Sequence, residues 1–171
     1  TRIVSAPAGR ELVALRETAS DESEVIPAID RLSKRLRERV GESLKSLNNT
    51  DPLEQVSTSS LEALKKYSQA VRLDDSGGDP VLAVQLMEEA IAADSTFAMA
   101  WRKLSVVVRR ANRPFSESLY ASQKAYDLRD RLSPIERQLA IANYYSTNEF
   151  DPDAVIAAYK AALEIDSTER T

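Results

Sequence analysis

The sequence predicts an all-α protein in which about three helix pairs stack into a solenoid, preceded by a short strand and a long amphipathic helix. Three stretches of similar sequence each end in an alanine, and these alanines, Ala90, Ala125 and Ala162, lie 35 and 37 residues apart. A period of this length is typical of helix-pair repeats. Residues that start and stop helices divide the chain at corresponding places.

Each repeat is expected to carry a bulky residue on its first helix and a small residue on its second. The alanine lets the next pair approach closely, and the bulky side chain fills the space between the two helices. The expected bulky residues are Leu64, Tyr67, Trp101, Leu104, Leu139 and Tyr145. Because no pair buries its apolar face alone, the pairs stack and share a core. The predicted pairs span residues 59–95, 97–131 and 133–167.

Three of the expected helix starts combine a capping side chain with a proline: Asp79-Pro80, Ser133-Pro134 and Asp151-Pro152. The capping oxygen accepts a hydrogen bond from a free N–H of the first turn, and proline fits the position that follows. Turns between paired helices are predicted at Gly77-Gly78, Asn112-Arg113-Pro114 and Thr147-Asn148.

These repeats resemble the tetratricopeptide family. The segments 87–94 and 157–166 resemble its second helix, and the run 101–104 resembles its first helix. The likeness covers residues 59–167, although the family's usual glycine is replaced by Ser68, Ser105 or Asn143. It implies a solenoid whose first helices line a concave groove that grips a protein or peptide segment. An unrelated helical bundle is the alternative.

The groove that this resemblance implies gives the candidate binding residues. Projection onto the helical period selects Lys65, Gln69, Arg72, Arg102, Val106, Arg109, Arg137 and Tyr144. Lysine and arginine side chains on such a surface favour carboxylates through charge-assisted hydrogen bonds, so the expected partners include acidic segments. The competing interpretation is that these are ordinary exposed side chains.

The first fifty residues do not follow the repeat. A strand is expected within residues 11–18, and a long helix over 23–47 carries an apolar stripe of Val25, Ile29, Leu32, Leu36, Val40, Leu44 and Leu47. We interpret residues 1–50 as the remnant of a preceding α/β domain or a flanking helix, 51–58 as a linker, and 59–171 as the repeats. A basic cluster on the long helix, from Arg31 to Arg39, is expected to be solvated and locally balanced.

Composition narrows the function. The chain has no Cys and no His, which excludes disulfides, Cys/His zinc sites and catalytic triads built on histidine. It contains no glycine-rich phosphate loop. A net charge of -4 argues against nucleic acid as a partner, and no apolar run is long enough to span a membrane. We therefore expect no enzyme activity, no cofactor and no bound metal in this chain.

The sequence thus predicts a non-catalytic protein–protein interaction module. The segment 32–44 resembles the region before the repeats in multidomain bacterial signalling proteins that carry a serine/threonine kinase or a cyclase- or regulator-type effector. We accordingly expect a regulatory or scaffolding part of a longer, membrane-anchored bacterial protein, on either side of the membrane. The alternative is a purely architectural role, in which the stack packs against a kinase, effector or sensor domain or forms a homo-oligomer through an uncapped end.

Overall fold

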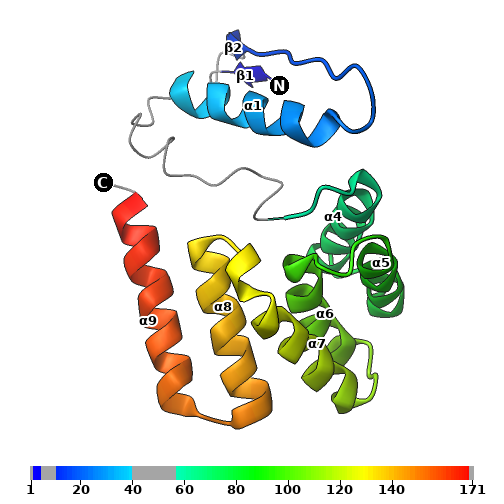
Figure 1. The fold of residues 1–171 in the computed structure, drawn as a ribbon, viewed down its shortest axis with the longest axis vertical. Coiled ribbons are helices and arrows are strands. Elements are labelled where there is room, and N and C mark those ends of the chain that lie inside the picture. The colour runs from blue at the N-terminus through cyan, green and yellow to red at the C-terminus, as the bar shows by residue number, and fades with distance from the viewer. Residues whose placement is uncertain (1, 5–10, 40–56, 170–171) are drawn as a thin grey trace. The chain divides into compact units, whose positions relative to one another are not determined.

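The computed structural model describes residues 2–4, 11–39 and 57–169 (Figure 1). The chain divides into two compact units, Thr1–Glu54 and Gln55–Thr171, which we call the N-terminal and C-terminal units. Each is described by itself. Within the described ranges no helix has the length and apolar character that a membrane crossing requires.

Within residues 2–4 and 11–39, the structure describes two short strands and one helix of the N-terminal unit. Strand β1 (Arg2–Val4) pairs antiparallel with β2 (Glu11–Ala14), and helix α1 spans Val25–Arg39. The expected strand over 11–18 corresponds to β2, which ends at Ala14. The expected helix over 23–47 begins at Val25, and its predicted part beyond residue 39 lies outside the described residues, as does the linker up to residue 56.

The basic cluster of α1 is partly neutralised within its own unit. Arg31 and Arg35 both pair with Glu17, and Lys34 pairs with Asp30 at 3.1 Å. The hydrogen bond from Arg35 lowers the pKa of Glu17 below its usual value. These pairs favour the interpretation of the cluster as a solvated, balanced face.

The C-terminal unit is a row of antiparallel helix pairs (Figure 1). Helices pack within pairs as α4 with α5, α6 with α7 and α8 with α9, and the contacts of α5 with α6 and of α7 with α8 join the pairs. The predicted all-helical, repeat-like architecture is confirmed at this level. The bounds are α4 Leu61–Asp75, α5 Pro80–Ala93, α6 Ala98–Arg110, α7 Phe115–Asp127, η1 Arg129–Arg131, α8 Pro134–Tyr144, η2 Tyr145–Glu149 and α9 Pro152–Glu169.

Capping side chains begin four of these helices. Ser60 and Ser133 accept the N–H of the residue three positions on, at 3.2 and 3.4 Å. Asp79 accepts the N–H of Val81 at 2.9 Å, and Asp151 caps α9 in the same way. Proline follows the last three of these caps at the first helical position, as the sequence indicates.

A left-handed residue reverses the chain inside each pair. Gly77 has φ +69°, Asn112 has φ +53° and Phe150 has φ +55°. Glycine and asparagine adopt this conformation readily, whereas phenylalanine adopts it at a cost. The predicted third turn at Thr147-Asn148 is wrong, because α8 continues as a π-helical segment to Glu149 and the chain reverses only at Phe150.

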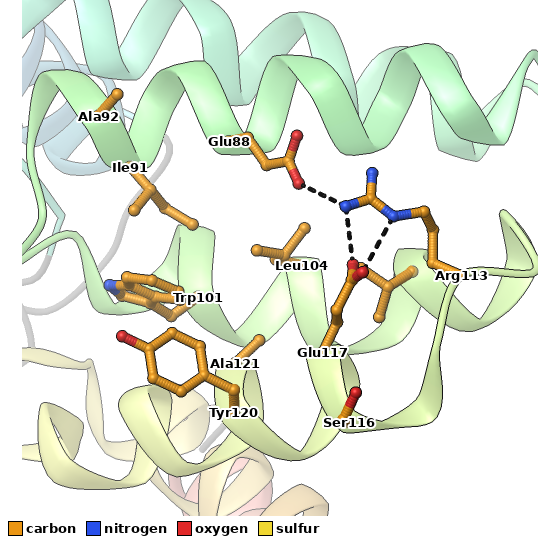
Figure 2. Close-up of a pocket in the computed structure, with 11 residues that line it drawn as sticks. Glu88, Ile91, Ala92, Trp101, Leu104, Arg113, Ser116, Glu117, Tyr120 and Ala121 are labelled. Carbon is orange, nitrogen blue, oxygen red and sulfur yellow. Dashed lines mark hydrogen bonds and ion pairs between the residues drawn. The ribbon is translucent and has the colours of Figure 1, made fainter.

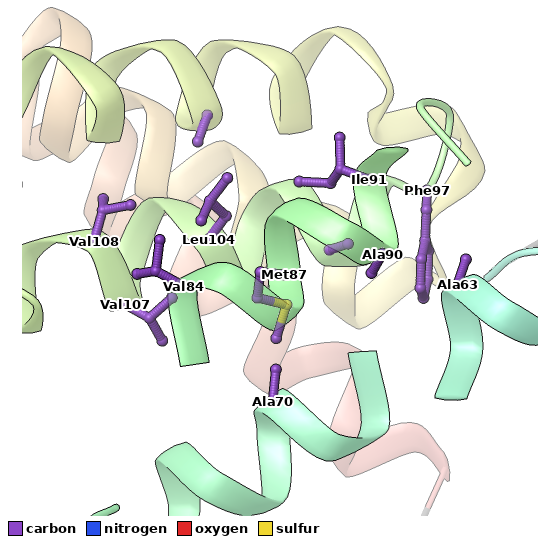
Figure 3. Close-up of a cluster of buried hydrophobic side chains, with 12 residues drawn as sticks. Ala63, Ala70, Val84, Met87, Ala90, Ile91, Phe97, Leu104, Val107 and Val108 are labelled. Carbon is purple, nitrogen blue, oxygen red and sulfur yellow. The ribbon is translucent and has the colours of Figure 1, made fainter. Parts of the chain in front are cut away.

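The main core lies between the first and second pairs (Figure 3). Its largest fully buried side chains are Phe97, Met87, Val84, Val107 and Val108. Four of the six expected gap-filling residues contribute as predicted: Leu104 is buried, and Leu64, Tyr67 and Trp101 pack against the cluster. The other two, Leu139 and Tyr145, belong to the third pair and are half-buried. A second and smaller cluster joins α6 to the third pair through Ala98, Leu132 and Ala140.

Polar contacts supplement this smaller cluster. Asn143 of α8 donates to the hydroxyls of Ser105 and Ser122, at 2.7 and 3.1 Å. Ser118 donates to the backbone oxygen of Ser105 at 2.7 Å. The serine side chains are buried, so these hydrogen bonds satisfy groups that would otherwise be costly to bury. The third pair is therefore tied to the second partly by hydrogen bonds.

Candidate functional site

An open pocket with a volume of about 490 Å³ lies between α5, α6 and α7 (Figure 2). Helices α5 and α7 are the second helices of adjacent pairs, and α6 forms the floor between them. The lining residues are Glu88, Ile91, Ala92, Trp101, Leu104, Val108, Arg113, Ser116, Glu117, Tyr120 and Ala121. The sequence-predicted groove is built instead from the first helices α4, α6 and α8.

The floor of the pocket is apolar. Ile91 comes from α5, Leu104 and Val108 come from α6, and Ala121 comes from α7. All four also belong to the main core. Because helix packing already fixes these side chains, the floor is formed before any ligand arrives.

Two aromatic side chains form one wall. The rings of Trp101 and Tyr120 meet edge to face, with centroids 5.7 Å apart. The indole N–H of Trp101 donates to the backbone oxygen of Ser95 at 2.9 Å, which fixes its orientation. Tyr120 is 57% exposed, so its ring offers apolar surface that the fold leaves uncovered. Lys124 places its ammonium nitrogen 5.5 Å from the centre of that ring.

A charged bridge closes the opposite rim. Arg113 contacts Glu88 of α5 at 3.2 Å and holds Glu117 of α7 with two nitrogens, at 3.2 and 2.9 Å (Figure 2). The left-handed Asn112 positions this arginine, because it turns the chain so that the Arg113 N–H donates to the backbone oxygen of Val108 at 3.1 Å. The local turn sequence thus places a cation between two carboxylates from different helices.

Four residues of the sequence-predicted groove lie on exposed surface of the first helices. They are Lys65, Gln69 and Arg72 of α4 and Arg109 of α6. Val106 of α6 is half-buried. This part of the predicted groove therefore offers accessible polar side chains.

The other predicted groove residues are engaged within the protein. Arg102 pairs with Glu136 of α8 at 2.6 Å. Arg137 donates to the backbone oxygens of Arg129 and Asp130, at 3.3 and 3.5 Å. Their guanidinium groups consequently stabilise contacts between helices, which weakens the expected attraction for acidic partners along this face.

Tyr144, the last predicted groove residue, belongs to a cluster of tyrosines. Its ring stacks on Tyr126 at 4.2 Å and meets Tyr145 edge to face. Its hydroxyl donates to Glu149 at 2.7 Å, and this hydrogen bond raises the pKa of Tyr144 to about 12. The residue therefore joins α7, α8 and the π-helical segment.

Sequence reasoning missed the rim and the aromatic wall of the pocket. Trp101 was expected only as a gap-filling residue, and Glu88, Arg113, Glu117 and Tyr120 were not selected. One signal was available: when the alanines that end each repeat are aligned, Tyr120 occupies the position of Gln85 and Ala157. A large aromatic residue at one repeat alone indicates a local role.

The described residues contain no group of three or more His, Cys, Asp or Glu side chains that could hold a metal ion. No known protein family matches the sequence, and no curated protein or solved structure matches it. Function therefore has to be inferred from the geometry of the helical stack.

Proposed function

We propose that the C-terminal unit is a protein-interaction module whose pocket between α5, α6 and α7 receives an apolar side chain from a partner segment. The observation that carries this proposal is the open cavity of about 490 Å³ with an apolar floor and an aromatic wall. This volume lies in the range of preformed ligand pockets. Burial of one large apolar side chain there would contribute about 1.5 to 3 kcal/mol.

The charges at the rim favour a particular kind of segment. Two carboxylates, Glu88 and Glu117, share one guanidinium from Arg113, so the rim keeps an excess of negative charge. A partner with a basic residue beside its apolar anchor is favoured over an acidic one. The expectation of acidic partners concerns a different surface, the first helices, where Lys65, Arg72 and Arg109 remain exposed while Arg102 and Arg137 are engaged within the protein.

The same proposal covers the type of module that the C-terminal unit forms and its role in a larger protein. The repeat spacing and the paired helices support a module of the tetratricopeptide type. Its role as the regulatory or scaffolding part of a larger bacterial signalling protein is proposed from the resemblance of segment 32–44 alone. The accessible residues Lys65, Gln69 and Arg72 supply a second contact region for a long partner segment. Catalysis has no part in this proposal.

Intrinsic tryptophan fluorescence can be used to test this proposal. Trp101 is the only tryptophan and lines the pocket, so its fluorescence reports occupancy directly. Peptides are selected from a displayed random library on the intact chain and then titrated while the emission is followed. We expect selected peptides to contain a large apolar residue and to shift the Trp101 emission.

A matched pair of variants locates the binding. Ala92→Phe fills the mouth of the pocket, whereas Ala93→Phe makes the same change at the next exposed position of α5, which does not line it. We expect Ala92→Phe to weaken binding by about tenfold or more and Ala93→Phe to leave it nearly unchanged. Equal binding by the two variants would show that peptides attach elsewhere.

A further inference from the structure

Arg113 holds the two carboxylates on the rim of the pocket unequally. It contacts both oxygens of Glu117, through Nε at 3.2 Å and Nη2 at 2.9 Å, but only one oxygen of Glu88, through Nη2 at 3.2 Å (Figure 2). Two parallel contacts of this kind hold a carboxylate more firmly than one does. Glu117 also lies only four positions from Arg113, whereas Glu88 belongs to another helix. The contact of Arg113 with Glu88 is therefore the one that opens more easily.

Glu88 is also the carboxylate that a partner in the pocket reaches best. Its side chain is 45% exposed, against 34% for Glu117. Ile91, three positions further along α5, belongs to the apolar floor. Residues at this spacing are neighbours on one face of a helix. A segment that packs an apolar side chain on Ile91 thus brings a flanking residue close to Glu88.

The charges on the rim select a cation as that flanking residue. With Arg113 alone, Glu88 and Glu117 keep one unit of negative charge between them. A second guanidinium on Glu88 would leave Arg113 to Glu117, so that each carboxylate had its own cation. Ion pairs between partly exposed side chains are weak, and Arg113 can therefore give up Glu88 readily.

The geometry favours arginine over lysine as the cation. Arg113 contacts only Oε1 of Glu88, whereas an incoming guanidinium can bind both oxygens in parallel. A lysine ammonium lacks this planar fork and is more strongly hydrated. The partner's basic residue is therefore expected to bind more tightly as arginine.

We infer that the partner segment carries an arginine beside its apolar anchor, and that this arginine replaces Arg113 on Glu88. The inference rests on the proposed function, because it concerns the same pocket. Glu88 is then the residue that binds the partner's arginine, and Arg113 is an internal competitor for it.

Paired peptides test the choice of arginine. A peptide selected on the intact chain is prepared with arginine or with citrulline, its uncharged near-isostere, at each position within two residues of the apolar anchor. At one position the arginine copy should bind about two- to fivefold more tightly than the citrulline copy, as is typical of an exposed ion pair. Equal binding of the two copies at every position would overturn the inference.

A matched pair of variants tests the role of Glu88. Glu88→Gln should abolish the preference for the arginine copy, as measured by the Trp101 emission. Glu89→Gln makes the same change at the next position of α5, which is exposed, pairs with Lys66 and does not line the pocket. This control should keep the preference. A preference that survives in both variants, or is lost in both, would contradict the assignment to Glu88.

Removal of the competitor tests the exchange itself. Arg113→Gln should strengthen binding of the arginine copy about twofold or more, because Glu88 no longer has to be released. Binding of the citrulline copy should stay unchanged. Arg131→Gln removes the same charge at an exposed position outside the pocket and should affect neither copy. An arginine copy that binds Arg113→Gln no more tightly than wild type would show that Arg113 does not compete.

This inference and the proposed function fail in different ways. If the pocket does not take the apolar anchor, Ala92→Phe will leave binding of the citrulline copy unchanged. If the pocket takes the anchor but no arginine replaces Arg113, Ala92→Phe will weaken both copies, and the arginine copy will have no advantage over the citrulline copy.

Discussion

The two junctions between the helix pairs differ in the size of the apolar cluster that they bury. Between the first and second pairs, a large apolar cluster around Met87 and Phe97 is fully buried. Between the second and third pairs, a small cluster is supplemented by the hydrogen bonds of Asn143 and the ion pair of Arg102 with Glu136. Helix pairs that repeat at nearly the same spacing are thus joined by a large apolar cluster at one junction and by a small cluster with polar contacts at the other. We expect the first junction to dominate global stability and the second to open locally.

Phe97→Ala should have the largest effect. The side chain is fully buried in the main core and packs against Tyr67 with ring centroids 4.9 Å apart. Its removal should lower the free energy of unfolding by about 3 to 5 kcal/mol. Urea denaturation measures the change. Phe115→Ala, at a 48% exposed position, is the control and should cost far less. Similar losses for both would contradict the assignment of the core.

Asp74→Asn tests the ionic part of the first junction. Only 5% of the Asp74 side chain is exposed, and it binds Lys103 and Arg110 of α6. Burial acts to raise the pKa of Asp74, but the hydrogen bonds from these two residues lower it overall, below the usual 3.8. The variant should lose about 1.5 to 3 kcal/mol at neutral pH, as is typical of hydrogen bonds to charged groups.

The sign of the pH dependence follows from the lowered pKa. The stabilising contribution of Asp74 is complete above the pKa of the unfolded chain and disappears as the pH falls through the folded value. The free energies of unfolding of wild type and Asp74→Asn, measured by urea denaturation, should therefore differ at pH 7 and begin to converge as the pH falls below about 3.8. A constant difference across this window would show that the ionised carboxylate is not responsible.

Asn143→Ala should destabilise the second junction selectively. The change leaves Ser105 and Ser122 without their Asn143 hydrogen bonds in a buried setting, which should cost about 1 to 2 kcal/mol. Amide hydrogen exchange should increase in α8 and α9 while α4 and α5 keep their protection. A uniform increase along the C-terminal unit would mean that the two junctions unfold as one.

Phe150→Gly should have the smallest effect, and it should be stabilising. Phenylalanine is strained at φ +55°, and its side chain is 69% exposed, so little packing is lost with it. The expected gain is about 0.5 to 1 kcal/mol, after the added freedom of glycine in the unfolded chain is subtracted. Asn112→Gly is the control and should gain less, because asparagine tolerates this conformation. Thermal unfolding resolves the difference.

The sequence predicts most of the helices because their starts depend on local chemistry. Asp79-Pro80 and Ser133-Pro134 act within one turn of chain, so pattern alone suffices to place α5 and α8. The third turn is different, because the π-helical segment Tyr145–Glu149 contacts α7, where Tyr145 meets Tyr126 edge to face. That contact joins distant parts of the chain, and no local pattern encodes it.

The candidate site also depends on contacts between distant parts of the chain, which a local sequence pattern does not predict. Helical projection identifies which face of α6 carries Arg102, but only the packing of α8 reveals that Glu136 neutralises it. The pocket is formed by three helices together, and its rim depends on Arg113 reaching both Glu88 and Glu117. Contacts between repeats, rather than the pattern within one repeat, decide which surface is open.

Amide chemical-shift mapping of the chain during titration with a selected peptide tests the central claim most directly. Binding in the pocket predicts the largest shifts in residues 88–92 and 113–121, together with a changed Trp101 indole signal. Shifts confined to Lys65, Gln69, Arg72 and Arg109, with the Trp101 signal unmoved, would contradict the pocket and place binding on the first helices.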